Sequence, residues 1–129
     1  MLDVESLETE QDLARVVEAR LPTRALDALR TAGYTDDEIY GFVVPRRTFS
    51  HRVARRERLS LEESDRIVRM LRIAAFGEHV FGESERFWSW FRAPKRRLEG
   101  RTPLSLLATA AGARAIEDLL GAIDEGFAA

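Results

Sequence analysis

The sequence contains no cysteine among its 129 residues. This absence excludes a disulfide framework, a thiolate nucleophile and a zinc site built on cysteine ligands. Histidine is also scarce, because only His51 and His79 are present and they lie far apart in the chain. We therefore expect no metal site, and nothing in the sequence indicates a cofactor. His51 is better interpreted as a contact to a nucleic-acid groove or phosphate.

Long apolar runs and extended β-branched alternation are nearly absent as well. No apolar stretch approaches the ~18 residues that a membrane-spanning helix requires. The acidic N-terminus lacks the basic-then-apolar pattern of a secretory signal. We expect an all-α protein that lies in the cytoplasm and has no membrane partner.

Catalytic motifs are missing too. The sequence has no glycine-rich phosphate loop, no G-x-S-x-G and no H-E-x-x-H. Adjacent carboxylates such as Glu62 and Glu63 are interpreted as helix-end charges. We therefore expect no catalytic residue and no enzymatic activity; a small carboxylate enzyme is the least favoured alternative.

Charge is present in an uneven pattern that the net charge of −2 conceals. Residues 1–38 carry ten acids and four arginines, whereas residues 39–101 carry eight acids and fifteen bases. Residues 102–129 carry four acids and one arginine. The middle of the chain is therefore suited to a polyanion. Nineteen of the twenty bases are arginine, which suits phosphate contacts, although a compositional bias of the source genome would give the same excess.

Helical periodicity divides the chain into three parts. Residues 1–20 are an acidic extension that we expect to be helical from 3 to 19. Residues 21–59 contain a helix from about 22 to 32, which Gly33 ends, and a short helix at 36–42. The pair Thr35 and Glu38 predicts a capping box for that short helix. Residues 60–129 form a third, wholly helical part.

A basic helix at about 45–56 follows the short helix after a tight turn. Six arginines and one acid lie between Arg46 and Leu59, and Phe49 and Val53 are expected on the inner face. The pattern predicts a helix–turn–helix that binds DNA, with its first residues at base edges and later arginines on phosphates. The alternative is a solvated arginine face on an ordinary bundle helix. The predicted DNA-binding residues are Arg46, Arg47, Thr48, Ser50, His51, Arg52, Arg55 and Arg56.

The third part begins with a second capping box, Ser60 and Glu63, ahead of a long helix at about 61–80. We expect Arg66 and Arg69 to pair with neighbouring acids at helical spacing. In the aromatic run at 87–91, Trp90 and Phe91 are expected in the core, and Trp88 or Phe87 at an interface. Thr109 and Gly112 indicate a break, followed by a last helix at 113–125.

The stretch from residue 22 to 127 resembles a known family. The resemblance is carried by LSLEESDRIVRMLRIAAFGEHVFG, WFRAP, LEGRTPLSLL and GARAIEDLLGAIDEG, in that order and spacing. These segments are similar to the Xre/MbcA/ParS-like antitoxins, the partners of RES-domain toxins in bacterial type II toxin–antitoxin pairs. Glu99 and Ala122 depart from the family pattern, where a glycine and a basic residue are common.

The resemblance implies an Xre-like helix–turn–helix followed by a helical toxin-binding domain. It implies a toxin that destroys NAD⁺, an antitoxin that covers the toxin's active-site cleft with its C-terminal region, and a complex that represses its own operon. On this basis the predicted toxin-binding residues are Arg101, Arg114, Glu117, Asp124 and Phe127.

The family resemblance and the basic helix–turn–helix together predict three partners, which are a RES-domain toxin, operator DNA and a second copy of the chain. A homodimer is expected because helix–turn–helix proteins usually bind paired half-sites. The alternative function is a stand-alone helix–turn–helix transcriptional regulator whose C-terminal half only dimerises.

Overall fold

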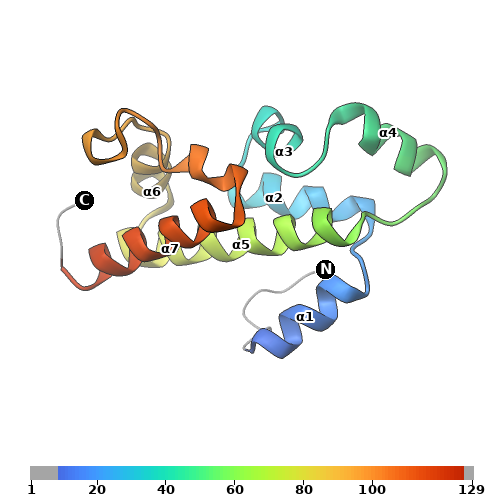
Figure 1. Ribbon diagram of the computed structural model, residues 1–129, viewed down its shortest axis with the longest axis horizontal. Helices are drawn as coiled ribbons and strands as arrows, with labels where there is room; N and C mark the ends of the chain where they lie inside the picture. The colour runs from blue at the N-terminus through green and yellow to red at the C-terminus, as the bar shows by residue number, and fades with distance from the viewer. Residues whose placement is uncertain (1–8, 127–129) are drawn as a thin grey trace. The chain divides into compact units, whose positions relative to one another are not determined.

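The computed structural model describes residues 9–126, and these consist of helices and connecting loops without a β-strand (Figure 1), which confirms the all-α prediction. None of the described helices is both long and apolar enough to cross a membrane. The chain divides into two compact units, residues 1–72 and 73–129. The elements are α1 (Glu10–Glu18), the 3₁₀ turn η2 (Thr23–Ala25), α2 (Leu26–Ala32), α3 (Asp36–Phe42), α4 (Arg46–Ala54), α5 (Leu61–Phe81), α6 (Ser84–Phe91), the 3₁₀ turns η3 (Arg96–Leu98) and η4 (Leu104–Ala108), and α7 (Ala110–Asp124).

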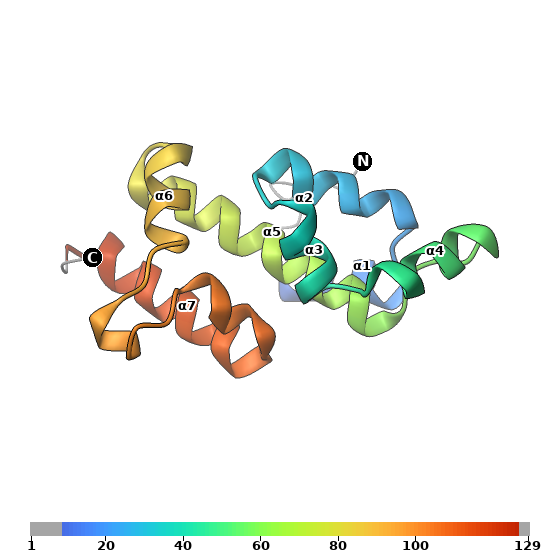
Figure 2. The same ribbon diagram turned by 90° about the horizontal axis from the view of Figure 1, so that it is seen from above.

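Unit 1 comprises α1 to α4 and the first turns of α5 (Figure 2). Its core is formed by apolar side chains of α1, α2, α3, α5 and the connections between elements, and α4 contributes no buried residue. The core contains Leu13, Leu21, Leu26, Leu29, Ile39, Val43, Val44, Leu59 and Ile67. The hydroxyl of buried Tyr34 donates to the Met70 carbonyl at 2.9 Å and so ties the α2–α3 connection to α5. Helix α1 begins at Glu10, and residues 3–8 of the expected helix lie outside the described residues.

Both predicted capping boxes are present. The Thr35 hydroxyl accepts from the Glu38 amide, and the Glu38 carboxylate accepts from the Thr35 amide. Ser60 and Glu63 exchange the same two bonds, at 2.7 and 3.1 Å. These bonds satisfy amides that the first turn of a helix leaves without a partner, so α3 and α5 begin where the sequence predicts.

The arginine-bearing helix α4 is shorter than the expected 45–56. Pro45 is its N-terminal cap and Arg55 its C-terminal cap, and Arg56 has a left-handed backbone with φ of 56°. Of the two residues expected on the inner face of this helix, only one is covered. Phe49 is half-buried, but Val53 is 50% exposed because it lies in the last turn of α4, which ends at Ala54.

Unit 2 comprises the last turns of α5, together with α6 and α7. All four aromatic residues of α6 are buried within the chain, which confirms the core prediction for Trp90 and Phe91. Trp88 and Phe87, one of which was expected at an interface, belong to the same core. The four rings pack against one another and against Phe81 of α5, with ring centroids 5.3 Å apart for Phe81 and Trp90. Gly77 lets α5 approach this cluster, because an added Cβ would lie 2.1 Å from the ring of Phe87.

The last helix begins at Ala110, three residues before the predicted start, and the expected break at Gly112 does not occur. Thr109 is the cap, and its hydroxyl accepts from the Gly112 amide at 2.9 Å. Gly112 is needed inside the helix because an added Cβ would lie 2.0 Å from the Leu106 carbonyl oxygen. What resembled a helix breaker is therefore a contact point between α7 and the turn η4.

Candidate functional site

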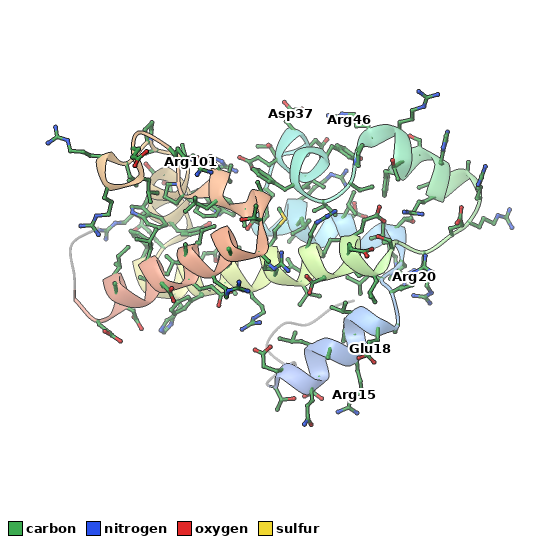
Figure 3. The ribbon with its side chains drawn as sticks, viewed as in Figure 1. Arg15, Glu18, Arg20, Asp37, Arg46 and Arg101 are labelled. Atoms are coloured by element: carbon green, nitrogen blue, oxygen red, sulfur yellow. The ribbon has the colours of Figure 1, made fainter. Side chains whose placement is uncertain are left out.

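The first turn of α4 is oriented by α3. Arg46 donates to the carboxylate of Asp37 at 3.2 Å, and its guanidinium lies 4.3 Å from the ring centroid of Tyr40. Figure 3 shows Asp37 and Arg46 beside each other. Both side chains are largely exposed, so this ion pair contributes little stability. Its effect is to direct Arg46, one of the predicted base-contacting residues.

Arg30 joins α2 to α3 underneath this turn. Its guanidinium donates to Asp27 at 2.7 Å, to Asp36 at 2.6 Å and to the hydroxyl of Tyr40 at 3.2 Å. The Tyr40 ring in turn meets the Phe49 ring of α4 edge-on, with centroids 5.8 Å apart. The three short helices are thus connected through one tyrosine, which holds α4 in a defined position.

Arg52 lies on the side of α4 that faces α5. It donates two hydrogen bonds to the carboxylate of Glu63, at 2.8 and 3.1 Å, and Glu63 is buried. Burial alone would raise the pKa of Glu63, but the hydrogen bonds from Arg52 and Ser60 outweigh burial and hold that pKa below its ordinary value. Arg52 therefore neutralises an internal carboxylate, and its predicted phosphate contact stays a prediction.

Most of the predicted DNA-binding residues other than Arg52 are exposed to solvent. Thr48 is half-buried, and the others are exposed: Arg46, Arg47, Ser50, His51, Arg55 and Arg56. Within residues 9–126, Arg47, Arg55 and Arg56 form no ion pair with a carboxylate. Three exposed cations without an acidic partner on and just after one short helix form a surface suited to phosphates.

Four hydrogen bonds, here called the clasp, join residues 20–21 to residues 58–64, on either side of the segment that contains α2, α3 and α4. Arg20 donates to the Leu59 carbonyl at 2.8 Å, and Arg58 donates to the Arg20 carbonyl at 2.9 Å. The Leu59 amide donates to the Leu21 carbonyl, and the Leu21 amide donates to the buried Ser64 hydroxyl, both at 2.9 Å. Arg58 is the last of the six arginines between Arg46 and Leu59, whose later members are expected on phosphates, and the structure places it in this clasp.

The acids at the start of α5 also differ from expectation. Arg69 pairs with Asp65 as predicted, whereas Arg66 donates to the Val43 carbonyl at 3.1 Å and not to a carboxylate. The Glu63 carboxylate forms its ion pair with Arg52 and not with Arg66. The difference arises because Val43 and Arg52 reach α5 from elements distant in the sequence.

The predicted toxin-binding residues lie in unit 2. Arg114, Glu117 and Asp124 share one side of α7 at helical spacing; Arg114 and Asp124 are exposed and Glu117 is half-buried. Arg101 is exposed in the loop after η3, and Phe127 lies outside the described residues. No group of three or more histidine, aspartate or glutamate side chains among residues 9–126 is placed to hold a metal ion.

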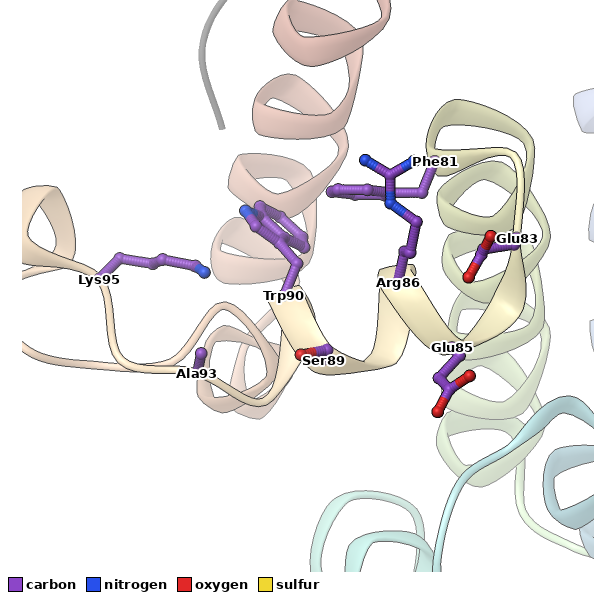
Figure 4. Close-up of a pocket in the computed structure, with 8 residues that line it drawn as sticks. All are labelled: Phe81, Glu83, Glu85, Arg86, Ser89, Trp90, Ala93 and Lys95. Carbon is purple, nitrogen blue, oxygen red and sulfur yellow. The ribbon is translucent and has the colours of Figure 1, made fainter.

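Unit 2 also contains a cleft that sequence patterns did not reveal. Its volume is about 470 Å³, and its lining residues are drawn in Figure 4: Phe81, Glu83, Glu85, Arg86, Ser89, Trp90, Ala93 and Lys95. Trp90 and Lys95 also line a narrower hollow behind it, formed with Leu119 and Ile123 of α7. The feature of the sequence that could have indicated this cleft is the basic loop at 95–101, which closely follows the aromatic helix at 84–91.

Comparison with known proteins relates the two units to two domain families. A family model described as the antitoxin Xre-like helix-turn-helix domain matches residues 12–72. A second model, described as the antitoxin Xre/MbcA/ParS C-terminal toxin-binding domain, matches residues 76–126.

Two curated relatives have names that agree with these family descriptions. A protein named Antitoxin Xre from Pseudomonas putida is 39% identical over 85 residues, which are 66% of this chain and 54% of that protein. Another Antitoxin Xre, from Yersinia enterocolitica, is 33% identical over 84 residues, or 64% of this chain and 57% of its own length. This chain thus spans about half the length of the curated relatives that it matches.

Proposed function

Because this chain belongs to the Xre/MbcA/ParS antitoxin family, we propose that it acts as the antitoxin of a bacterial type II toxin–antitoxin pair. The observation that carries the proposal is the order of the two matched domains, a helix–turn–helix at 12–72 and a toxin-binding domain at 76–126. Each match falls on one compact unit of the structure, which supports a division of roles between the two units.

For unit 1 we propose binding to operator DNA and repression of the antitoxin's own operon. The support is the surface formed by Arg47, Arg55 and Arg56, which no carboxylate of the described residues neutralises. Arg46, Ser50 and His51 lie exposed on α4, where a helix seated in the major groove would bring them to the bases. A homodimer fits this proposal, since two copies would bind paired half-sites.

For unit 2 we propose that the partner is a RES-domain toxin that degrades NAD⁺. The antitoxin would neutralise it by covering its active-site cleft, with α7 and the residues after it contributing to the interface. The support is the similarity of residues 22–127 to antitoxins of RES toxins and the exposure of Arg101, Arg114 and Asp124. The proposed action is binding alone, and it requires no catalytic residue in this chain.

Co-expression with the product of the adjacent gene tests the proposal. We expect that gene product to arrest growth when expressed alone, and this chain to restore growth and co-purify with it. Deleting residues 121–129 should abolish rescue and leave operator binding intact, because the deletion touches only the end of unit 2.

The same experiment distinguishes an antitoxin from the alternative, a stand-alone transcriptional regulator. A chain that binds its operator but neither restores growth nor forms a complex is a stand-alone regulator. Intact rescue by the truncated chain would place the toxin interface elsewhere.

A further inference from the structure

We propose that the cleft at Trp90 and Lys95 is the seat for an acidic side chain of the toxin, whose carboxylate accepts hydrogen bonds from both residues. The inference rests on the proposed function, because it takes the toxin as the partner. It specifies the chemistry of one contact, which the predicted toxin-binding residues on α7 do not include.

Trp90 supplies a hydrogen-bond donor whose acceptor is not found within the described residues. The residue is only 8% exposed, and its indole Nε1 is buried without a hydrogen-bond partner in residues 9–126. Buried polar groups in folded proteins are almost always hydrogen-bonded, and an unsatisfied one is costly. Trp90 lines both the cleft and the narrower hollow. Its Nε1 is not exposed in the chain alone, so an acceptor that enters the cleft would bond to it once the lining side chains shift.

Lys95 supplies a second donor beside the first. Its Nζ lies 5.3 Å from the centroid of the Trp90 ring, and Figure 4 shows the lysine side chain extending toward that ring. Burial lowers the pKa of Lys95, and within residues 9–126 no carboxylate forms an ion pair with it. A carboxylate has the two acceptor oxygens that would satisfy both donors and compensate the desolvated ammonium.

The loop around Lys95 is preorganised and basic. The Lys95 amide donates to the Arg101 carbonyl, and the Gly100 amide donates to the Lys95 carbonyl, both at 2.9 Å. Residues 92–101 contain five basic residues and one acid, Glu99. A fixed backbone lowers the entropy lost on binding, and the positive charge attracts an acidic partner segment.

The cleft also determines what accompanies the carboxylate. Phe81 and Ala93 line it beside Trp90, so an apolar neighbour of the acidic residue would be buried there. Glu83 and Glu85 lie on the part of the cleft formed at the start of α6 and would repel a second acid. The fitting ligand is therefore a single aspartate or glutamate next to an apolar side chain, rather than a run of acids or a polyphosphate.

The test uses the full chain and the toxin obtained by co-expression. Lys95→Met removes the ammonium but keeps the aliphatic chain, and we expect it to weaken the complex at least about tenfold. Trp90→Phe removes the N–H group and should weaken the complex about threefold to tenfold. Arg96→Met is the matched control, because it removes the same charge at an exposed neighbouring position, and it should change the affinity less than about threefold.

A measurement on the wild-type chain accompanies the variants. In ¹⁵N-labelled protein the indole N–H resonance of Trp90, identified by its loss in Trp90→Phe, should move when the toxin is added. Wild-type affinity of Lys95→Met, equal weakening by Arg96→Met, or an unmoved Trp90 resonance in a formed complex each overturns this inference and leaves the proposed function intact. Failure of the wild-type chain to bind the toxin overturns both.

Discussion

Arg52 and Glu63 form a two-pronged ion pair that fastens the arginine-bearing helix to the start of α5, with donor–acceptor distances of 2.8 and 3.1 Å. Glu63 also accepts from the Ser60 amide, so one buried carboxylate serves both as the cap of α5 and as the anchor of α4. The two residues lie in different helices, so their bond fixes α4, which carries the exposed arginines, against α5. Arg52 is thus a positioning residue in unit 1.

The first prediction separates Arg52 from its exposed neighbours. Arg52→Ala should lower the free energy of unfolding by roughly 2 to 4 kcal/mol, because it leaves the Glu63 carboxylate buried without its cation. The slope of log K for DNA against log salt should stay at the wild-type value, since Arg52 neutralises Glu63 and not a phosphate. Urea unfolding and DNA titrations at several salt concentrations measure both effects.

Arg55→Ala is the matched control for that slope. Arg55 is exposed and has no acidic partner among the described residues, so its loss should reduce the slope by about 0.9 and leave stability unchanged within roughly 0.5 kcal/mol. If Arg52→Ala lowers the slope as Arg55→Ala does, Arg52 contacts a phosphate in the complex, as sequence patterns predict.

The second prediction concerns acid stability. Because the folded state holds the pKa of Glu63 below its ordinary value of 4.5, the ionised carboxylate stabilises the fold above that pH. This stabilisation should be lost as the pH falls through the lowered pKa of the folded state. Glu63→Gln should therefore be less stable than wild type at pH 7, and the difference should shrink in acid. A stability gap that is constant between pH 7 and pH 3 would contradict the assignment.

The third prediction compares two glycines of α7. Gly112→Ala should destabilise unit 2 by more than about 1 kcal/mol, because its Cβ would lie 2.0 Å from the Leu106 carbonyl oxygen and backbone must move. Gly121→Ala should be neutral or stabilising by up to about 1 kcal/mol, since nothing lies within 4 Å of its Cβ and alanine favours a helix. Thermal unfolding of both variants tests this, and equal effects would contradict the close contact between η4 and α7.

The fourth prediction addresses the clasp that joins residues 20–21 to residues 58–64. Ser64 is fully buried and accepts from the Leu21 amide, so Ser64→Ala should cost roughly 1 to 3 kcal/mol by leaving that amide unsatisfied. Ser50→Ala removes an exposed hydroxyl from α4 and should change stability by less than about 0.5 kcal/mol. Comparable unfolding free energies for the two variants would show that the clasp contributes little.

Short-range chemistry made much of the fold predictable. Thr35 with Glu38, and Ser60 with Glu63, marked the starts of α3 and α5 correctly, because a capping box is satisfied within four residues. The run of helices followed from apolar spacing together with these caps and the glycine at position 33. The start of α7 was missed because Gly112 is suited to a break by propensity, whereas its place in the helix depends on a contact with Leu106.

The sequence by itself determined an all-helical chain with a basic middle and the family to which it belongs, since these depend on local propensity, composition and ordered motifs. Only the tertiary structure decided which arginines have no acidic partner among the described residues and which are paired internally, as Arg52 is with the buried Glu63. It likewise placed Lys95 beside the buried indole of Trp90. The physical reason is that burial and partner geometry arise when distant segments pack, and no spacing within one segment encodes them.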